Sequence, residues 1–505
     1  MDERRPASVG SSQLQKFMLL AVTGLILAIS YVITYHIFMY WDVSWHIQAA
    51  NRMLHGGSYI RNLVDDNPPM TFAFFLPLAL WQQISGVLSV HVASAYIYAT
   101  YLIGLTLSYI ILAKSSFLPW KRNVIYIAVV LGVLILGITI LGQRELNAVC
   151  FFTPYLLNNL FNKKLSLKYS IAIAVLAVLG ITQVPFYCLL PVVIDIISVI
   201  KKQNHLRQVQ ICFYALFVFT MSVNYILYPG YFNVLVPILA SAQAALNANY
   251  ESIFGPIFFN ALGFCFALMV LLLFRISNKL EIIKLLLVIV TCMCIYLMEG
   301  KSWYYHFFPV IYFIVLTFIY VITLQDFSKW FKTETIVPFV VLLMFVFMSP
   351  LLLIRGNATS VNNKTSDLYK IIQFSRSIQN KNATALFFTT RVTPTYLVQL
   401  YTGLNVISPW ANDWLTPSIV DNKTSMSTKI QLKVFYKRLL VKSMQSKPDY
   451  IFYITGKSIP YISQEKFNYY NYLSEEMGFA SQLKNYKSIG SVGNFVILRR
   501  KDSVG

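Results

Sequence analysis

Long apolar runs separated by short polar segments dominate the first two thirds of the chain. Many of these runs hold about 18 to 22 residues with little charge, enough for a helix to cross a hydrocarbon core of roughly 30 Å. Alternation at period two, which is typical of a membrane barrel, is absent from these runs. The pattern predicts a polytopic α-helical membrane protein with about eleven transmembrane helices, at 17–38, 92–113, 124–141, 147–161, 169–182, 185–200, 210–228, 255–274, 282–298, 304–324 and 335–354.

Basic residues mark every second loop between these predicted spans. They precede the first span and follow the second, fourth, sixth, eighth and tenth. Positive charge collects on the cytoplasmic side of membrane proteins, so this alternation predicts a cytoplasmic N-terminus. Residues 39–91 then form a large first external loop. The segment Met70–Val90 is apolar enough to span, but counting it would invert every later loop, so we expect it to lie along or dip into the membrane.

Residues 355–505 differ abruptly in composition from the preceding 354. Helical periodicity appears at Asp367–Gln379 and Lys429–Met444, and strand patterns appear at Ala385–Thr390, Tyr450–Thr455 and Asn494–Leu498. We therefore predict a transmembrane domain at 1–354 and a small extracytoplasmic α/β domain at 355–505. The second domain carries twenty Lys and Arg against eight Asp and Glu. This charge serves either solubility beside a membrane or contact with anionic headgroups or an anionic acceptor.

Composition supports the membrane assignment and limits the role of cysteine. Hydrophobic residues make up 57% of the chain and charged residues 12%, with a mean hydropathy of +0.60. A soluble domain of this composition would expose far more apolar surface than water tolerates. All six cysteines lie in apolar segments, which argues against a disulfide framework. Cys292 and Cys294 have an unusual spacing for zinc and no partner pair, so we expect core packing.

Two polar clusters stand in the predicted first external loop. Asp42 begins a helical pattern that ends near Gly56-Gly57, and His46 follows it by one turn. Asp42 either caps this helix or acts as a catalytic base, and the two roles are compatible. Further on, Asp65-Asp66-Asn67 precedes two prolines that exclude helix. This second cluster is either a solvated turn or part of a site, with Asp66 and Asn67 as its candidates.

Two later outer turns also carry charge. Gln143-Arg144-Glu145 places both signs of charge between apolar spans, where they are costly unless they are used or paired. The alternative is an internal Arg144–Glu145 pair. The other turn runs from Glu299 to His306 and includes Lys301 and Trp303. The Lys301 ammonium suits a phosphate, although a single lysine at a helix end also snorkels to the interface.

These segments together resemble the GT-C glycosyltransferases, which take a sugar from a polyprenyl-phosphate carrier. The likeness to the protein O-mannosyltransferases and the lipid A aminoarabinose transferases rests on Asp42, on the helix ending in Gly56-Gly57-Ser58-Tyr59, on Asn67-Pro68-Pro69 and on Glu145. Gln143-Arg144-Glu145 and Gly300-Lys301-x-Trp303-x-x-His306 also resemble motifs of a bacterial subgroup of unassigned substrate. The chain departs from the aminoarabinose transferases at Asn67, where they carry lysine.

The resemblance implies an inverting glycosyltransferase with Asp42 as general base. Arg144 and Lys301 would bind the donor phosphate, and Glu145, with Asp42, would hold Mg²⁺ or Mn²⁺. The implied partners are a polyprenyl-phosphate-linked sugar, an extracytoplasmic lipid, glycan or protein acceptor, and membrane lipid, with no nucleic acid. The expected location is a multi-pass protein of the bacterial inner (plasma) membrane.

Two other functional classes remain open from the sequence. One is a transporter or flippase, which would use ionisable residues at mid-membrane, where Asp195 is the exception among nearly uncharged central spans. The other is a polymerase or ligase for envelope polysaccharide. Such enzymes usually rely on arginines in a large later loop, whereas this chain has its charged cluster in the first one.

Overall fold

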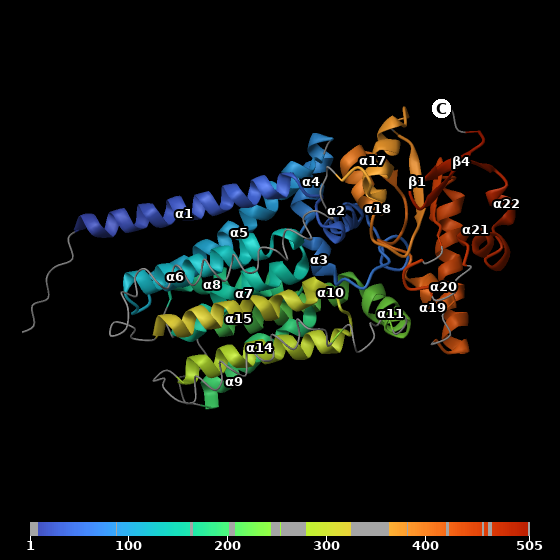
Figure 1. Cartoon of the computed structure of the whole chain (residues 1–505). Coiled ribbons are helices and arrows are strands. Elements are labelled where there is room, and N and C mark those ends of the chain that lie inside the picture. Colours follow the sequence, from blue (N-terminus) through green and yellow to red (C-terminus); the bar gives the residue numbers. More distant parts are fainter. Residues whose placement is uncertain are drawn as a thin grey trace, which may run out of the picture.

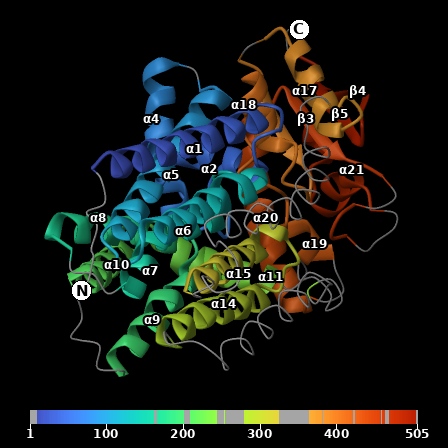
Figure 2. The same ribbon diagram turned by 60° about the vertical axis from the view of Figure 1, so that its left-hand side comes forward.

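A computed structural model of the chain describes residues 9–86, 88–161, 165–200, 208–243, 253, 279–324, 363–380, 382–420, 424–456, 459–462 and 467–502. Helices run side by side in a bundle, and a small sheet with its own helices lies at one end of it (Figure 1). The start of α1 lies at the opposite end of the bundle from this sheet. The turned view in Figure 2 shows α1 along one edge of the bundle and α9 and α14 at another.

Among the described residues, six helices are long and apolar enough to cross a membrane. They are α1 (Val9–Tyr35), α5 (Val90–Ala113), α6 (Pro119–Leu131) continued by the π-helix η1 (Gly132–Leu136), α10 (Gln208–Leu227), α14 (Lys279–Glu299) and α15 (Tyr304–Leu324). The side chains of Phe17 and Leu20 on α1 are 70% and 72% exposed. Apolar surface of this kind is stable against lipid, which supports a membrane-spanning protein.

The predicted count of eleven spans is not confirmed. Three predicted spans are helices that do not meet the length and hydropathy of a membrane span: α7 (Arg144–Phe161), α8 (Leu167–Ile181), and η3 (Pro185–Cys188) with α9 (Leu189–Ile200). Polar residues such as Asn147 and Asn158 lower the hydropathy of α7, which is buried along nearly its whole length. The predicted spans at 255–274 and 335–354 lie outside the described residues.

The first loop forms three helices instead of one span. They are α2 (Trp41–Leu54), α3 (Pro69–Ala73) and α4 (Leu76–Ser85). A membrane crossing needs about 20 helical residues, and α4 has 10. Leu80, Trp81 and Ile84 on α4 are 45%, 50% and 84% exposed. A helix of this length is too short to cross a membrane by itself, and the exposed side chains of α4 form an apolar surface. That the segment lies along or dips into the membrane stays a prediction.

A five-stranded mixed sheet organises the C-terminal part. Its order is β2-β1-β3-β5-β4, with β1 parallel to β2 and β3, and β5 antiparallel to β3 and β4. The strands are β1 (Thr384–Phe388), β2 (Asn405–Val406), β3 (Tyr450–Ile454), β4 (Tyr486–Val492) and β5 (Phe495–Arg500). β1, β3 and β5 coincide with the three predicted strands, and β2 and β4 were not predicted.

The remaining short elements surround this sheet or join it to the bundle. They are η2 (Ile138–Ile140), η4 (Tyr231–Leu235), α11 (Val236–Gln243), α17 (Asp367–Ser377), α18 (Thr395–Thr402), α19 (Leu415–Val420), α20 (Met426–Gln445), α21 (Tyr469–Asn471), η7 (Tyr472–Glu476) and α22 (Ala480–Leu483). Ser366 and Ser425 cap α17 and α20 by accepting from backbone N–H groups. These two helices match the predicted helical segments.

The first loop and the sheet share one hydrophobic core. Trp45, Tyr59 and Phe72 of the loop are buried in the same cluster as the sheet residues Phe387 and Phe452. A backbone bond from Val64 N to Pro409 O, 2.8 Å long, joins the two parts as well. The loop that carries Asp42 is therefore held by residues far along the chain. The predicted domain boundary at 354–355 lies outside the described residues.

Candidate active site

A cavity of about 450 Å³ lies where the first loop, two later outer turns and the C-terminal part meet. Six of the residues predicted for the site line it, namely Asp42, Asp66, Asn67, Arg144, Lys301 and Trp303. Asp65 and Tyr40 add to the same wall. The structure thus brings together charged residues separated by more than 250 positions in the sequence, at the end of the bundle that carries the sheet (Figure 1).

Asp42 stands in the first turn of α2 but does not cap the helix. The N-cap position is Tyr40, which makes no side-chain capping bond. The Asp42 carboxylate instead accepts a hydrogen bond from the Gln143 amide, Nε2 to Oδ2, 2.7 Å. Burial raises the pKa of Asp42 from 3.8 to about 6, against the opposing effects of Gln143 and Arg144. The capping interpretation is therefore wrong, and Asp42 is a carboxylate poised to accept a proton near neutral pH.

Arg144 links the first loop to the second outer turn. Its Nε donates to Glu145 Oε1 at 2.9 Å, and its Nη1 donates to Asn67 Oδ1 at 2.8 Å. The Asn67 side chain in turn donates to Asp65 Oδ1 at 2.5 Å. Burial lowers the pKa of Arg144, but the charges of Glu145 and Asp66 outweigh this and raise it well above its ordinary value. The internal Arg144–Glu145 pair that the sequence left open is present, and Arg144 also faces the cavity.

Lys301 enters the cavity from the loop between α14 and α15. Its Nζ lies 3.5 Å from Asp66 Oδ2 and 4.7 Å from the centre of the Trp303 ring. Burial raises the pKa of Asp66, but the charges of Lys301 and Arg144 outweigh this effect and lower it below 3.8. Burial and the neighbouring Asp66 raise the pKa of Asp65 well above 3.8. The surroundings of the two adjacent carboxyls therefore favour the ionised form of Asp66 and the protonated form of Asp65.

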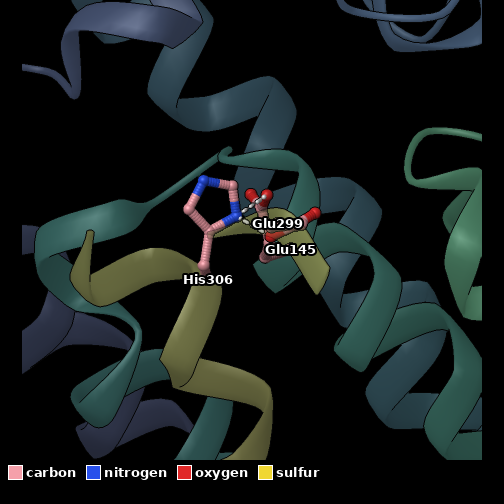
Figure 3. A group of neighbouring side chains, drawn as sticks. All are labelled: Glu145, Glu299 and His306. Carbon is pink, nitrogen blue, oxygen red and sulfur yellow. Dashed lines mark ion pairs between the residues drawn. The ribbon is translucent and has the colours of Figure 1, made fainter. Parts of the chain in front are cut away.

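Glu145, Glu299 and His306 form a compact group beside Arg144 (Figure 3). One ligand atom from each lies within 4.8 Å of the other two. His306 Nδ1 is 3.3 Å from Glu145 Oε1 and is in contact with Glu299 Oε2. Glu145 Oε2 is buried without a hydrogen-bond partner among the described residues.

This group has a donor set that fits a divalent cation. Two carboxylates and an imidazole suit Mn²⁺ or Zn²⁺ better than Mg²⁺, which prefers oxygen ligands and water. Asp42 is not a member of the group, and its own carboxylate is bonded by Gln143. Glu299 did not appear among the predicted ligands, because its role depends on the return of α15 beside α14.

His46, unlike the other predicted site residues, belongs neither to the cavity lining nor to the group beside Arg144. It is 1% exposed, and its ring packs against Phe72 and Phe75 at centroid distances of 5.8 and 5.9 Å. Neither ring nitrogen has a hydrogen-bond partner among the described residues. Burial, reinforced by Arg144, lowers the pKa of His46 to about 3, so the imidazole is neutral. Its position one turn after Asp42 places it on the packed side of α2.

Asp195 is engaged in a separate buried network. Its carboxylate accepts bonds from the side chains of Tyr155, Asn159, Gln210 and Tyr214, at 2.5 to 2.9 Å. These donors come from α7 and α10, which pack around α9. A carboxylate with four donors is satisfied by the protein itself and joins three helices. Its contacts favour a structural role over the transport role that the sequence left open.

Sequence reasoning missed the wall contributed by the C-terminal part. Thr390, Arg391, Asn412, Trp414 and Tyr461 line the cavity from loops that follow β1, β2 and β3. The Trp303 indole N–H donates to the Tyr461 hydroxyl at 3.2 Å, which joins this wall to the Lys301 loop. The position of Arg391 directly after a predicted strand could have indicated this wall. Ligands collect at the carboxyl ends of parallel strands, and Thr390 and Arg391 follow the parallel strand β1.

Comparison with protein-family models finds no match, and comparison with curated proteins finds none either. Among solved structures, the chain is similar to the archaeal oligosaccharyltransferase AglB from Archaeoglobus fulgidus, in complex with an inhibitory peptide and a dolichol-phosphate. The TM-score is 0.45 at 10% sequence identity, over 97% of this chain and 75% of that one. A score below 0.5 does not establish a shared fold, so function has to be argued from the site.

Proposed function

We propose that the chain is an inverting glycosyltransferase that moves a sugar from a polyprenyl-phosphate carrier to an extracytoplasmic acceptor. The observation that carries this proposal is the cavity itself. It combines a carboxylate with a pKa of about 6, Asp42, with two cations from later turns, Arg144 and Lys301. A base and an anion-binding pair in one cavity suit displacement of a phosphate from an electrophilic carbon.

Each residue has a defined task in this reaction. The acceptor hydroxyl or amine attacks the anomeric carbon, and its proton passes to the Asp42 carboxylate. The bond between that carbon and the phosphate oxygen breaks, and its electron pair stays on the phosphate. Arg144 and Lys301 stabilise the charge that develops there. A single displacement inverts the configuration at the anomeric carbon.

The group formed by Glu145, Glu299 and His306 supplies a place for a divalent cation in this proposal. A bound cation would add positive charge beside Arg144, which bonds to Glu145. Without a cation, His306 can instead share its proton between the two carboxylates. In either case the group fixes Glu145, which orients the Arg144 guanidinium toward Asn67 and the cavity.

The proposal is tested with purified full-length protein and a panel of polyprenyl-phosphate hexoses and pentoses, with release of polyprenyl phosphate followed by mass spectrometry. We expect Asp42→Asn to reduce release at least a hundredfold, because the amide cannot accept the proton. Glu475→Gln, an exposed change in the C-terminal part, is the matched control and should retain full activity. Full release by Asp42→Asn at normal protein level would rule out Asp42 as the base.

The thermal stability of Asp42→Asn shows whether its loss of activity is confined to the site. Folding raises the pKa of Asp42, so ionising it costs stability increasingly as the pH rises from about 4 to about 6. Asparagine removes that cost. We therefore expect Asp42→Asn to raise the Tm more at pH 8 than at pH 4.5. A lower Tm at pH 8 would instead indicate that the variant is damaged by misfolding.

A further inference from the structure

The catalytic cavity continues into a groove between the start of α2 and the C-terminal part. A second cavity of about 250 Å³ shares four lining residues with it, Tyr40, Trp41, Arg391 and Thr393. Its other wall comes from the start of α17 and from α18. A ligand in this groove reaches the cavity beside Asp42, which directly follows Trp41 in α2.

The groove leads on toward the membrane boundary. A third cavity, of about 540 Å³, lies at the ends of α1 and α5 and shares Phe38 with the groove. A small space of about 10 Å³, lined by Thr34, Met39 and Thr139 among others, lies between the two. Two candidate membrane spans end and begin here, at Tyr35 and Val90. The path from this opening to Asp42 therefore starts at the level where lipid headgroups lie.

Arg391 stands at the junction of the groove and the catalytic cavity. Arg144 and Lys301 are already engaged with Glu145, Asn67 and Asp66. The Arg391 side chain is exposed, and its guanidinium makes no hydrogen bond or ion pair with the described residues. Among the described cations of the cavity it is thus the one whose side chain has no partner in the described part of the protein.

Further polar groups of the path point to a polar ligand. Thr390 is 1% exposed and lines the catalytic cavity, and its Oγ1 has no hydrogen-bond partner among the described residues. Thr139 Oγ1, between the groove and the outer opening, also has no hydrogen-bond partner among the described residues. The groove also contains a carboxylate, Asp367, but that group accepts a bond from the Asn494 amide at 2.9 Å. Arg376 lines the outer opening, so cations stand at both ends of the path.

We propose that this path admits an acceptor from the membrane, and that Arg391 determines specificity by binding an anionic group, phosphate or carboxylate, on an amphiphilic lipid. A guanidinium binds such groups through paired N–H donors. The nucleophile of the same acceptor then faces Asp42 while the donor phosphate occupies the Arg144–Lys301 side. The inference rests on the proposed glycosyl transfer, because it names the acceptor class of that reaction.

Lipid retention tests the binding site without any sugar donor. Full-length protein in nanodiscs of mixed phosphatidylglycerol and phosphatidylcholine is extracted into detergent, and the lipid it retains is quantified by mass spectrometry. We expect wild type to retain phosphatidylglycerol preferentially. Arg391→Gln should lower that retention roughly tenfold, while Arg391→Lys keeps part of it and the exposed control Arg438→Gln keeps all of it. Equal retention by Arg391→Gln would overturn the proposal, as would equal displacement by soluble glycerol phosphate, which would place the ligand in solution.

Donor consumption separates this inference from the proposed function. Asp42→Asn should retain phosphatidylglycerol like wild type, because the carboxylate does not contact the anionic group. Arg391→Gln should lower transfer to the acceptor much more than slow release of polyprenyl phosphate to water, and the exposed control Arg438→Gln should lower neither. If wild type consumes no polyprenyl-phosphate sugar at all, the proposed function fails while the retention result still judges Arg391. If Arg391→Gln loses donor release to water, Arg391 is a donor contact and the acceptor assignment is overturned.

Discussion

At the scale of single residues, the site depends on how burial and partners set each charge. Asp42 and Asp66 line the same cavity, yet the pKa of Asp42 is raised and that of Asp66 is lowered. Both are desolvated, but Lys301 and Arg144 compensate Asp66, whereas the main partner of Asp42 is the neutral amide of Gln143. This contrast supports the proposed base role of Asp42 and leaves Asp66 as the counter-ion of Lys301.

The activity should therefore rise with pH around the pKa of Asp42. A base works only when ionised, so we expect the acid limb of the pH–rate profile to have its midpoint near pH 6. The Gln143 hydrogen bond lowers the Asp42 pKa, and Gln143→Leu should move the midpoint upward while the plateau rate persists in part. The measurement is initial rate from pH 4.5 to 8.5. A midpoint that stays in place in Gln143→Leu would show that the limb belongs to another group.

At the scale of elements, α2 is the piece that joins the bundle to the C-terminal part. Arg52, in its last turn, donates to the carbonyls of Asn62, Val406 and Ser408 and to the Tyr396 hydroxyl. Its guanidinium also lies 5.4 Å from the ring centres of Trp45 and Tyr396. One end of α2 thus carries Asp42, and the other is fastened to β2 and α18. Because these contacts join α2 to the C-terminal part, we expect a displacement of that part to move α2 as well.

Removing the hydrogen bonds of Arg52 should weaken the attachment of α2 to the C-terminal part. Arg52→Met leaves three carbonyls without their charged donor, and losses of this kind cost about 2–4 kcal/mol. We expect a clearly lower Tm and faster proteolysis in the loop around residues 403–412. Arg61→Met, at an exposed position in the first loop after α2, is the control and should behave like wild type. An unchanged Tm in Arg52→Met would show that apolar contacts alone hold α2 in place.

At the scale of the whole molecule, the sequence predicted many helices and strands, but it did not predict which distant segments meet at the site. Hydrophobic runs located the long helices, and alternation located β1, β3 and β5, because these depend on neighbouring residues. The membership of Glu299 in the group with Glu145 and His306, and of Arg391 in the cavity wall, depends on contacts between distant segments. The burial of His46 was missed because Phe72 and Phe75, which cover it, come from α3 and the turn after it.

The orientation of the protein in the membrane can be tested by labelling cysteines placed at its two ends. Ser116 follows α5 at the end of the bundle remote from the sheet, and Ser427 is exposed on α20 beside the sheet. Basic residues near Ser116 predict that its end is cytoplasmic. In intact cells we expect a membrane-impermeant maleimide to label Ser427→Cys, and to label Ser116→Cys only after permeabilisation. The native cysteines set the background, which the unsubstituted chain measures. Labelling of Ser116→Cys alone in intact cells would place Asp42 on the cytoplasmic side, where the acceptor could not be extracytoplasmic.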